Sequence, residues 1–116
     1  MYIKQTIPLD PDFEWLDDDW YPTEDALRYI KDWNTSEYTA LFDVIQSLWW
    51  MPEFGWHDED AKCEITGSTV RRYTLSTGGW SGNESLIEAL QSNWIVWSMT
   101  WVMHKRGGHY VFEVKL

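Results

Sequence analysis

Several features that often announce a function are scarce in this 116-residue chain. Cys63 is the only cysteine, which excludes an internal disulfide and a cysteine-rich zinc site. The strongest apolar run, Trp94–Trp97, is far shorter than the ~20 residues that a membrane-spanning helix needs. The first residues also lack the apolar core of a signal peptide. We therefore expect a cytoplasmic protein that does not associate with a membrane.

Basic residues are scarce as well, with 9 Lys and Arg against 19 Asp and Glu and a net charge of −10. The imbalance is concentrated in residues 1–60, where 15 acidic side chains accompany three basic ones. Such a field repels a phosphate backbone, so direct binding of nucleic acid is not expected. A basic partner fits this charge, as does a small anion held locally in the second half.

Aromatic residues, by contrast, are abundant, with 10 Trp, 6 Tyr and 4 Phe. Each ring can bury ~150–250 Å², so the supply of core side chains does not limit folding. Some rings exceed what one small core can hold, and these are candidates for a binding surface.

In the first half, residues 2–7 fit a short edge strand, and the prolines of residues 8–22 favour an extended acidic segment. A helix is predicted at about 24–33, with Thr23 as its cap. A second helix follows Ser36, which we expect to cap it, and ends before Pro52 and Gly55. A loop rich in acidic residues is predicted at 57–60, and it leads into a hairpin of strands 62–66 and 69–76.

In the second half, a third helix is predicted at about 84–93, capped by Ser81 or Asn83. Alternating side chains from Ile95 to His104 have the period of a strand, and residues 105–108 turn the chain into a returning strand at 110–116. The predicted order is α-α-β-β-α-β-β. It indicates a single compact α+β domain over 1–116, with helices packed on an antiparallel sheet.

The most suggestive motif is a glycine-rich loop between a strand and a helix. Its backbone N–H groups and the helix start could hold a phosphate or carboxylate, with the tryptophan ring as a stacking surface. It matches neither a Walker loop nor a dinucleotide fingerprint. The alternative interpretation is a plain strand-to-helix turn. The candidate ligand-binding residues are Thr77, Gly78, Gly79, Trp80, Ser81, Gly82 and Asn83.

A second glycine-containing turn could complete this site. Arg106 would supply a cation suited to carboxylate or phosphate, and His109 a titratable group, if the turn lies beside the glycine-rich loop. The alternative is a hairpin turn in which Gly107 and Gly108 simply adopt positive φ.

The acidic N-terminal segment suggests a different function, a DNA mimic that occupies the basic groove of a host enzyme. In an extended segment its charges reach about half the linear density of a DNA strand. The alternative is an ordinary solvated face. The candidate partner-binding residues are Asp10, Asp12, Glu14, Asp17, Asp18, Asp19, Glu24 and Asp25.

No spacing of His, Asp, Glu and Cys matches a known metal site, and no arrangement of residues indicates a nucleophile with its base. We therefore expect no metal, no cofactor and no catalytic residues. A non-enzymatic protein is favoured, and a small nucleotide-cleaving enzyme that uses His104 or His109 is the least supported alternative.

Residues 76–84, with the sequence STGGWSGNE, and the segment RGGHY at 106–110 resemble the C-terminal half of small uncharacterised bacteriophage-encoded proteins. The resemblance covers roughly residues 70–114. It implies action in the cytoplasm of an infected bacterium and no particular chemistry. Two functions follow as expectations. One is a binding protein that holds an anionic small molecule, such as a nucleotide signal of host defence, and the other is an acidic inhibitor of a basic host protein.

Overall fold

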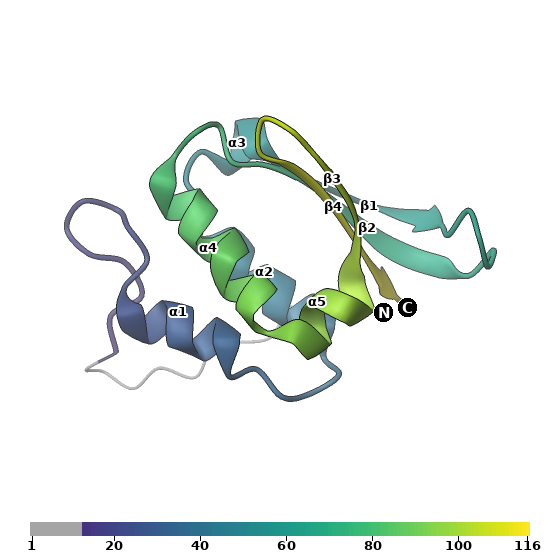
Figure 1. The fold of residues 1–116 in the computed structure, drawn as a ribbon, viewed down its shortest axis with the longest axis horizontal. Helices are drawn as coiled ribbons and strands as arrows, with labels where there is room; N and C mark the ends of the chain where they lie inside the picture. Colours follow the sequence, from purple (N-terminus) through teal and green to yellow (C-terminus); the bar gives the residue numbers. More distant parts are fainter. Residues whose placement is uncertain (1–12) are drawn as a thin grey trace.

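The computed structural model describes residues 13–116, in which helices cover one face of a four-stranded antiparallel sheet of order β1-β2-β4-β3 (Figure 1). The predicted α+β class and single domain are confirmed. The elements are α1 (Glu24–Lys31), α2 (Tyr38–Leu48), α3 (Pro52–Gly55), β1 (Trp56–Lys62), β2 (Thr69–Ser76), α4 (Ser81–Ser92), α5 (Trp94–Thr100), β3 (Trp101–Lys105) and β4 (His109–Lys115). Helices α3 and α5 are additions to the predicted order. The strand predicted at 2–7 lies outside the described residues, as do Asp10 and Asp12.

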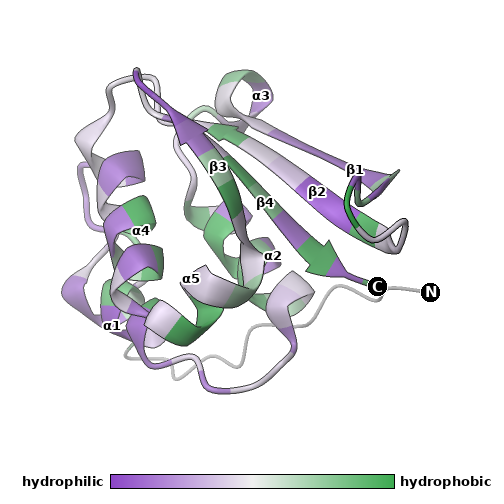
Figure 2. Ribbon diagram, turned by 45° about the vertical axis from the view of Figure 1, so that its right-hand side comes forward, coloured by the Kyte–Doolittle hydropathy of each residue, from purple (hydrophilic) through white to green (hydrophobic). Residues whose placement is uncertain are grey.

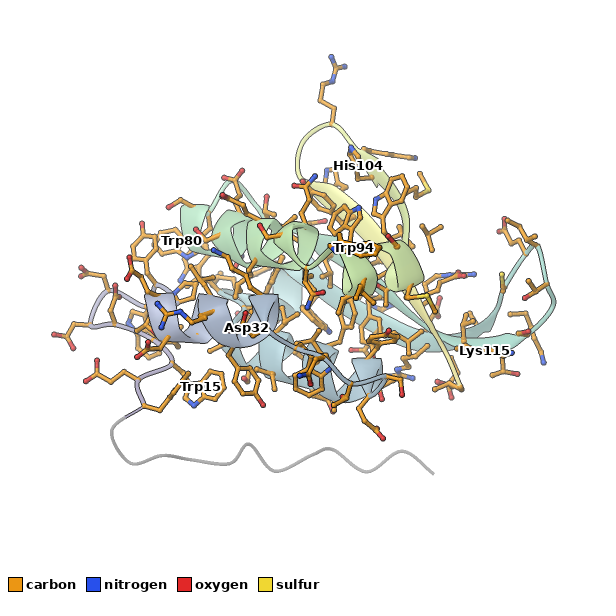
Figure 3. The ribbon with its side chains drawn as sticks, turned by 60° about the horizontal axis from the view of Figure 1, so that its bottom comes forward. Trp15, Asp32, Trp80, Trp94, His104 and Lys115 are labelled. Atoms are coloured by element: carbon orange, nitrogen blue, oxygen red, sulfur yellow. The ribbon has the colours of Figure 1, made fainter. Side chains whose placement is uncertain are left out.

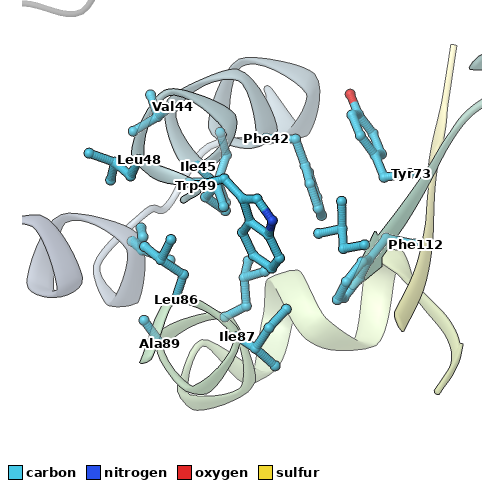
Figure 4. Packing of buried hydrophobic residues seen from close by; sticks show 14 of the residues in the cluster. Phe42, Val44, Ile45, Leu48, Trp49, Tyr73, Leu86, Ile87, Ala89 and Phe112 are labelled. Atoms are coloured by element: carbon cyan, nitrogen blue, oxygen red, sulfur yellow. The ribbon is translucent and has the colours of Figure 1, made fainter. Parts of the chain in front are cut away.

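The core lies between the helices and the sheet. Phe42 of α2 stacks on Tyr73 of β2 with ring centroids 4.4 Å apart, and it also contacts Phe112 of β4 (Figure 4). Trp49, at the end of α2, is 4% exposed and packs beside Ile87 of α4. The hydrophobic stripes of the helices therefore face the sheet, while polar residues lie outward (Figure 2).

The first helix is capped as predicted. Thr23 has extended backbone angles, and its Oγ1 accepts a hydrogen bond of 3.1 Å from the backbone N–H of Ala26. Glu24 and Asp25 lie in the first turn, where the helix dipole favours negative charge. Ala26 and Ile30 are fully buried, so this amphipathic helix packs its apolar side inward.

The prediction of a loop at residues 57–60 is wrong, because these residues belong to β1. The strand predicted at 62–66 is correspondingly placed too late, since β1 ends at Lys62. Asp58 and Asp60 face the same side of the sheet as Arg71 of β2, which forms ion pairs with both carboxylates. The positive charge of Arg71 on the neighbouring strand offsets the repulsion between these carboxylates, which had favoured a loop over a strand in the prediction.

The strand predicted from Ile95 is also wrong over its first part, because residues 94–100 form helix α5. Its cap, Asn93, accepts a hydrogen bond from the N–H of Val96 and donates to the backbone carbonyls of Ile30 and Trp33, at 3.1 and 2.9 Å. Val96 and Thr100 are buried one turn apart. Long-range bonds of Asn93 thus favour a helix where alternation suggested a strand.

Two predicted caps differ as well. Helix α2 begins after Glu37 without a side-chain cap, so Ser36 does not cap it. Helix α4 begins at Ser81 after Trp80, again without a side-chain cap, which places Asn83 inside the first turn. That position gives Asn83 a different role, described below.

Strand β3 forms one edge of the sheet. Every residue of it is exposed, and its pairing with β4 shifts register between Trp101 and Met103. The preceding helix α5 leaves Trp94 72% exposed. Trp80 and Trp15 lie toward one end of the molecule and Lys115 toward the other (Figure 3).

Candidate functional site

The two glycine-containing segments lie side by side. The N–H of Thr77 donates a hydrogen bond of 3.0 Å to the carbonyl of Gly108, and Ser76 Oγ lies 2.8 Å from His109 Nδ1. The pairing of β2 with β4 also places Ser76 opposite His109. The condition on which a shared site at these loops depends is therefore met.

Close packing between these segments requires glycine at one position. Gly108 has φ of +81°, and a Cβ there would lie 2.2 Å from Thr77 Oγ1. Gly78 and Gly79 also have positive φ, but a Cβ on either would meet nothing within 4 Å. Both the close contact with Thr77 and the positive φ therefore require glycine at position 108. At Gly78 and Gly79, which are exposed, only the positive φ favours glycine.

Asn83 faces the interior of the glycine-rich loop. It is 2% exposed, its Oδ1 accepts from the N–H of Trp50 at 2.8 Å, and its Nδ2 donates to the carbonyls of Trp50 and Thr77 at 3.1 and 3.3 Å. Gly82, next to it in the chain, is also buried, and a Cβ added there would lie 2.7 Å from Trp80 Nε1. The amide of Asn83 therefore holds protein groups, and a ligand would have to compete for them.

Trp80 stacks on two other rings. The ring centroids of Tyr21 and Trp50 lie 4.8 and 4.5 Å from that of Trp80. The planes of both rings are within about 22° of parallel to the Trp80 ring. Ser81 Oγ lies 3.3 Å from Tyr21 Oη. We call Tyr21, Trp80 and Trp50 the tryptophan sandwich. The stacking role expected of Trp80 is fulfilled within the protein.

The remaining predicted residues of this site are solvent-exposed. Arg106 lies in the β3–β4 turn, and among residues 13–116 it has no ion-pair partner. A small cavity of about 190 Å³ lies beside the glycine-rich loop, lined mainly by Trp50, Met51 and Phe54 together with Gly78. No charged side chain of residues 13–116 lines this cavity, so an anion inside it would lack a counter-charge from this part of the chain.

The centre of the acidic N-terminal segment forms a tight loop. A β-bridge joins Leu16 to Pro22, and we call the segment Leu16–Pro22 the acidic loop. Asp17 Oδ1 accepts from the N–H groups of Asp19 and Tyr21, at 2.9 and 3.0 Å. The backbone N–H of Asp17 donates to the Tyr21 carbonyl at 2.9 Å, and that of Thr23 donates to the Trp15 carbonyl at 3.1 Å, so the loop is closed by backbone bonds together with the Asp17 side chain.

Three other side chains of the acidic loop, those of Asp18, Asp19 and Trp20, are exposed to solvent. Asp18 and Asp19 are exposed, and Trp20 is 67% exposed with φ of +68°, a conformation that a bulky side chain seldom adopts. Glu14, Glu24 and Asp25 are also exposed, and Asp25 makes a weak surface ion pair with Arg28 at 3.6 Å. The loop thus offers two carboxylates and an indole in a fixed arrangement.

A third group of titratable residues was not predicted from the sequence. Arg71 bridges Asp58 and Asp60 between β1 and β2, and Trp56 Nε1 donates to Asp58 at 2.8 Å. Nearby on α2, burial and the charge of Asp58 raise the pKa of Asp43 to about 6, although Arg71 acts in the opposite direction. The alternation of Trp56, Asp58 and Asp60 was the available signal, because it has the period of a strand.

Within the part of the chain that the structure describes, no group of three or more His, Cys, Asp or Glu residues is placed to hold a metal ion. None of the helices described is long and apolar enough to cross a membrane. No family model, curated protein or solved structure matches this chain. The geometry of the loops is therefore what points to a function.

Proposed function

We propose that this protein is a non-enzymatic binding protein that recognises a basic protein surface through its acidic loop. The observation that carries the proposal is the fixed presentation of Asp18, Asp19 and Trp20, which project from a loop closed by Asp17. A preorganised loop loses little conformational entropy when it binds. Tryptophan is also enriched among the residues that dominate binding energy at interfaces.

The charge of the chain supports the same proposal. A net charge of −10 steers a basic partner toward the acidic surface and repels nucleic acid. The three carboxylates of the acidic loop are exposed, and none of them forms an ion pair with a lysine or arginine among residues 13–116. The resemblance to bacteriophage-encoded proteins would place the partner, a basic host protein, in the cytoplasm of an infected bacterium.

The test is binding to an arginine-rich peptide, compared between two variants that remove the same charge. We expect Asp18→Asn with Asp19→Asn to weaken binding at least fivefold, and affinity to fall steeply with salt because exposed charges are screened. Glu84→Gln with Glu88→Gln on α4 is the matched control, since both residues are exposed. Equal losses in the two variants would mean diffuse attraction by net charge and would overturn the acidic loop as the site.

A second candidate function is the binding of an anionic small molecule, such as a nucleotide, at the glycine-rich loop. The adjacency of Thr77 and Gly108 favours it, because exposed Gly78 and Gly79 then lie in the same region as the β3–β4 turn that carries Arg106. Under this proposal Arg106→Ala abolishes the rise in melting temperature that nucleotides cause, while Asp17→Asn leaves it intact. Unchanged stabilisation in the Arg106 variant would remove this site.

A further inference from the structure

A groove of about 360 Å³ lies between the acidic loop and the corner that joins α2 to α3. Leu16 and Trp20 form the side contributed by the loop, and Trp50, Met51 and Glu53 form the opposite side. Its volume is at the lower end of the range for ligand-binding clefts, ~300–1,000 Å³, which suits one long side chain better than a large ligand.

The sides of the groove are aromatic and accessible. Trp50 is covered by Trp80 in the tryptophan sandwich, yet it remains 40% exposed. Trp20 is 67% exposed and Met51 is 37% exposed. Apolar surface of this kind is costly to leave in water, and its concentration around one groove marks a place where another molecule binds.

The charge around the groove is of one sign. Glu53 belongs to its lining and is exposed, and Asp18 and Asp19 immediately precede Trp20 in the acidic loop. Among residues 13–116, no lysine or arginine lines the groove. Aromatic faces beside carboxylates attract a cation that can be desolvated, which favours the planar, weakly hydrated guanidinium group over an ammonium group.

Hydrogen bonds hold both sides of the groove in place. Asn83 holds the N–H and the carbonyl of Trp50, and the Met51 carbonyl accepts from the N–H groups of Phe54 and Gly55 at 3.1 and 3.2 Å. On the other side, the N–H of Trp20 donates to the Asp17 carbonyl at 3.1 Å. The groove therefore exists before a partner arrives.

We propose that this groove receives an arginine side chain of the basic partner, with the guanidinium group between the indoles of Trp20 and Trp50 and its N–H groups directed at Glu53. This inference rests on the proposed function and names the side chain that the acidic surface selects. The acidic loop supplies long-range attraction, and the groove supplies recognition of arginine.

The experiment follows the indole N–H signals of the ¹⁵N-labelled protein during titration with acetyl-Gly-Gly-Arg-Gly-Gly-amide. Trp20→Phe and Trp50→Phe assign the two signals of the groove. Trp94 is the matched control, because it is 72% exposed but lies on α5. We expect saturable shifts of the Trp20 and Trp50 signals and none of the Trp94 signal, and Glu53→Gln should weaken binding at least fivefold.

Analogues of the peptide decide whether the groove recognises arginine. Replacing arginine by citrulline keeps the shape and removes the charge, and we expect this peptide not to bind. Equal binding of the lysine or citrulline peptide would overturn the inference, as would equal shifts at Trp94. If the single-arginine peptide leaves the groove unaffected while the arginine-rich peptide still depends on Asp18 and Asp19, the inference fails and the proposed function stands. Loss of that dependence would contradict the proposed function itself.

Discussion

The acidic loop and the glycine-rich loop solve the same backbone problem in opposite ways. Both need residues with positive φ, which the second supplies with Gly78 and Gly79 and the first with Trp20. In the glycine-rich loop, Asn83 binds three backbone groups and Thr77 packs against Gly108. In the acidic loop, Asp17 is the only residue whose side chain is seen to bond to the loop backbone, through two N–H groups of the described residues. The polar side chains of the glycine-rich loop are thus mostly used by the fold, whereas Asp18 and Asp19 of the acidic loop are available to a partner.

This difference shows that a motif's residue types do not reveal whether its polar groups are free. Glycines before a helix promised a ligand site, yet Asn83 and Trp80 are engaged inside the protein. A run of aspartates suggested a DNA mimic or an ordinary solvated face, yet the side chain of one of them, Asp17, bonds to the backbone of the loop. Substitutions that remove these bonds separate the two loops experimentally.

The largest effect is expected for Asn83→Ala. It leaves the N–H and carbonyl of Trp50 without partners in a buried site, which should lower the free energy of unfolding by about 3 kcal/mol. Urea denaturation measures this loss, and Asn34→Ala at an exposed position is the control, with a change below about 0.5 kcal/mol. A loss below about 1 kcal/mol for Asn83→Ala would mean that its bonds do not persist in solution.

A smaller effect is expected for Gly108→Ala, at about 2 kcal/mol, because the new Cβ meets Thr77 Oγ1 and φ is positive. Gly79→Ala has the same conformational cost but no contact, so it should lose only about 1 kcal/mol. Thermal or urea denaturation of both variants separates packing from conformation. Equal losses would show that the two glycine segments do not touch as closely as described.

The smallest effect concerns a carboxylate that the fold partly buries. The pKa of Asp43 is raised to about 6 by burial and by Asp58, so the folded state holds this proton more tightly than the unfolded state. The stability that Asp43 contributes is therefore fully present below about pH 4 and is lost as the pH rises through about 6. Asp43→Asn should stabilise the protein by about 1 kcal/mol at alkaline pH and flatten this dependence.

Urea denaturation at several pH values measures the Asp43→Asn effect. Asp18→Asn in the acidic loop is the matched control, because that side chain is exposed, and it should leave the pH dependence of the wild type in place. If the free energy of unfolding changes between pH 4 and pH 7 in the same way in the wild type and in Asp43→Asn, the raised pKa of Asp43 is contradicted.

The sequence predicts elements whose signals are local. Thr23 capping α1, the strand at 69–76 and the turn at 105–108 follow from capping, alternation and glycine. Strand β1 and helix α5 were mispredicted because their stabilising partners are distant. Arg71 neutralises Asp58 and Asp60 across the sheet, and Asn93 bonds to carbonyls about 60 residues earlier.

The candidate sites follow the same division. The sequence allowed for adjacency of the two glycine segments, since both contain turn residues beside neighbouring strands. The groove could not be predicted, because tertiary packing of Tyr21 and Trp50 on Trp80 brings the acidic loop beside the corner that joins α2 to α3. The hydrogen bonds that close the acidic loop were likewise hidden, since a run of aspartates does not show which one bonds to the backbone.

Asn83 also connects the two candidate sites, since the same amide holds Trp50 beside the groove and the carbonyl of Thr77 beside the glycine-rich loop. A bound molecule that shifts this amide from one side would therefore change the free energy of binding on the other side. Thermodynamic linkage makes the coupling reciprocal, so the factor by which occupancy of one loop alters affinity at the other is equal in both directions. One buried asparagine thereby gives a small domain the means to make two surfaces cooperative or mutually exclusive.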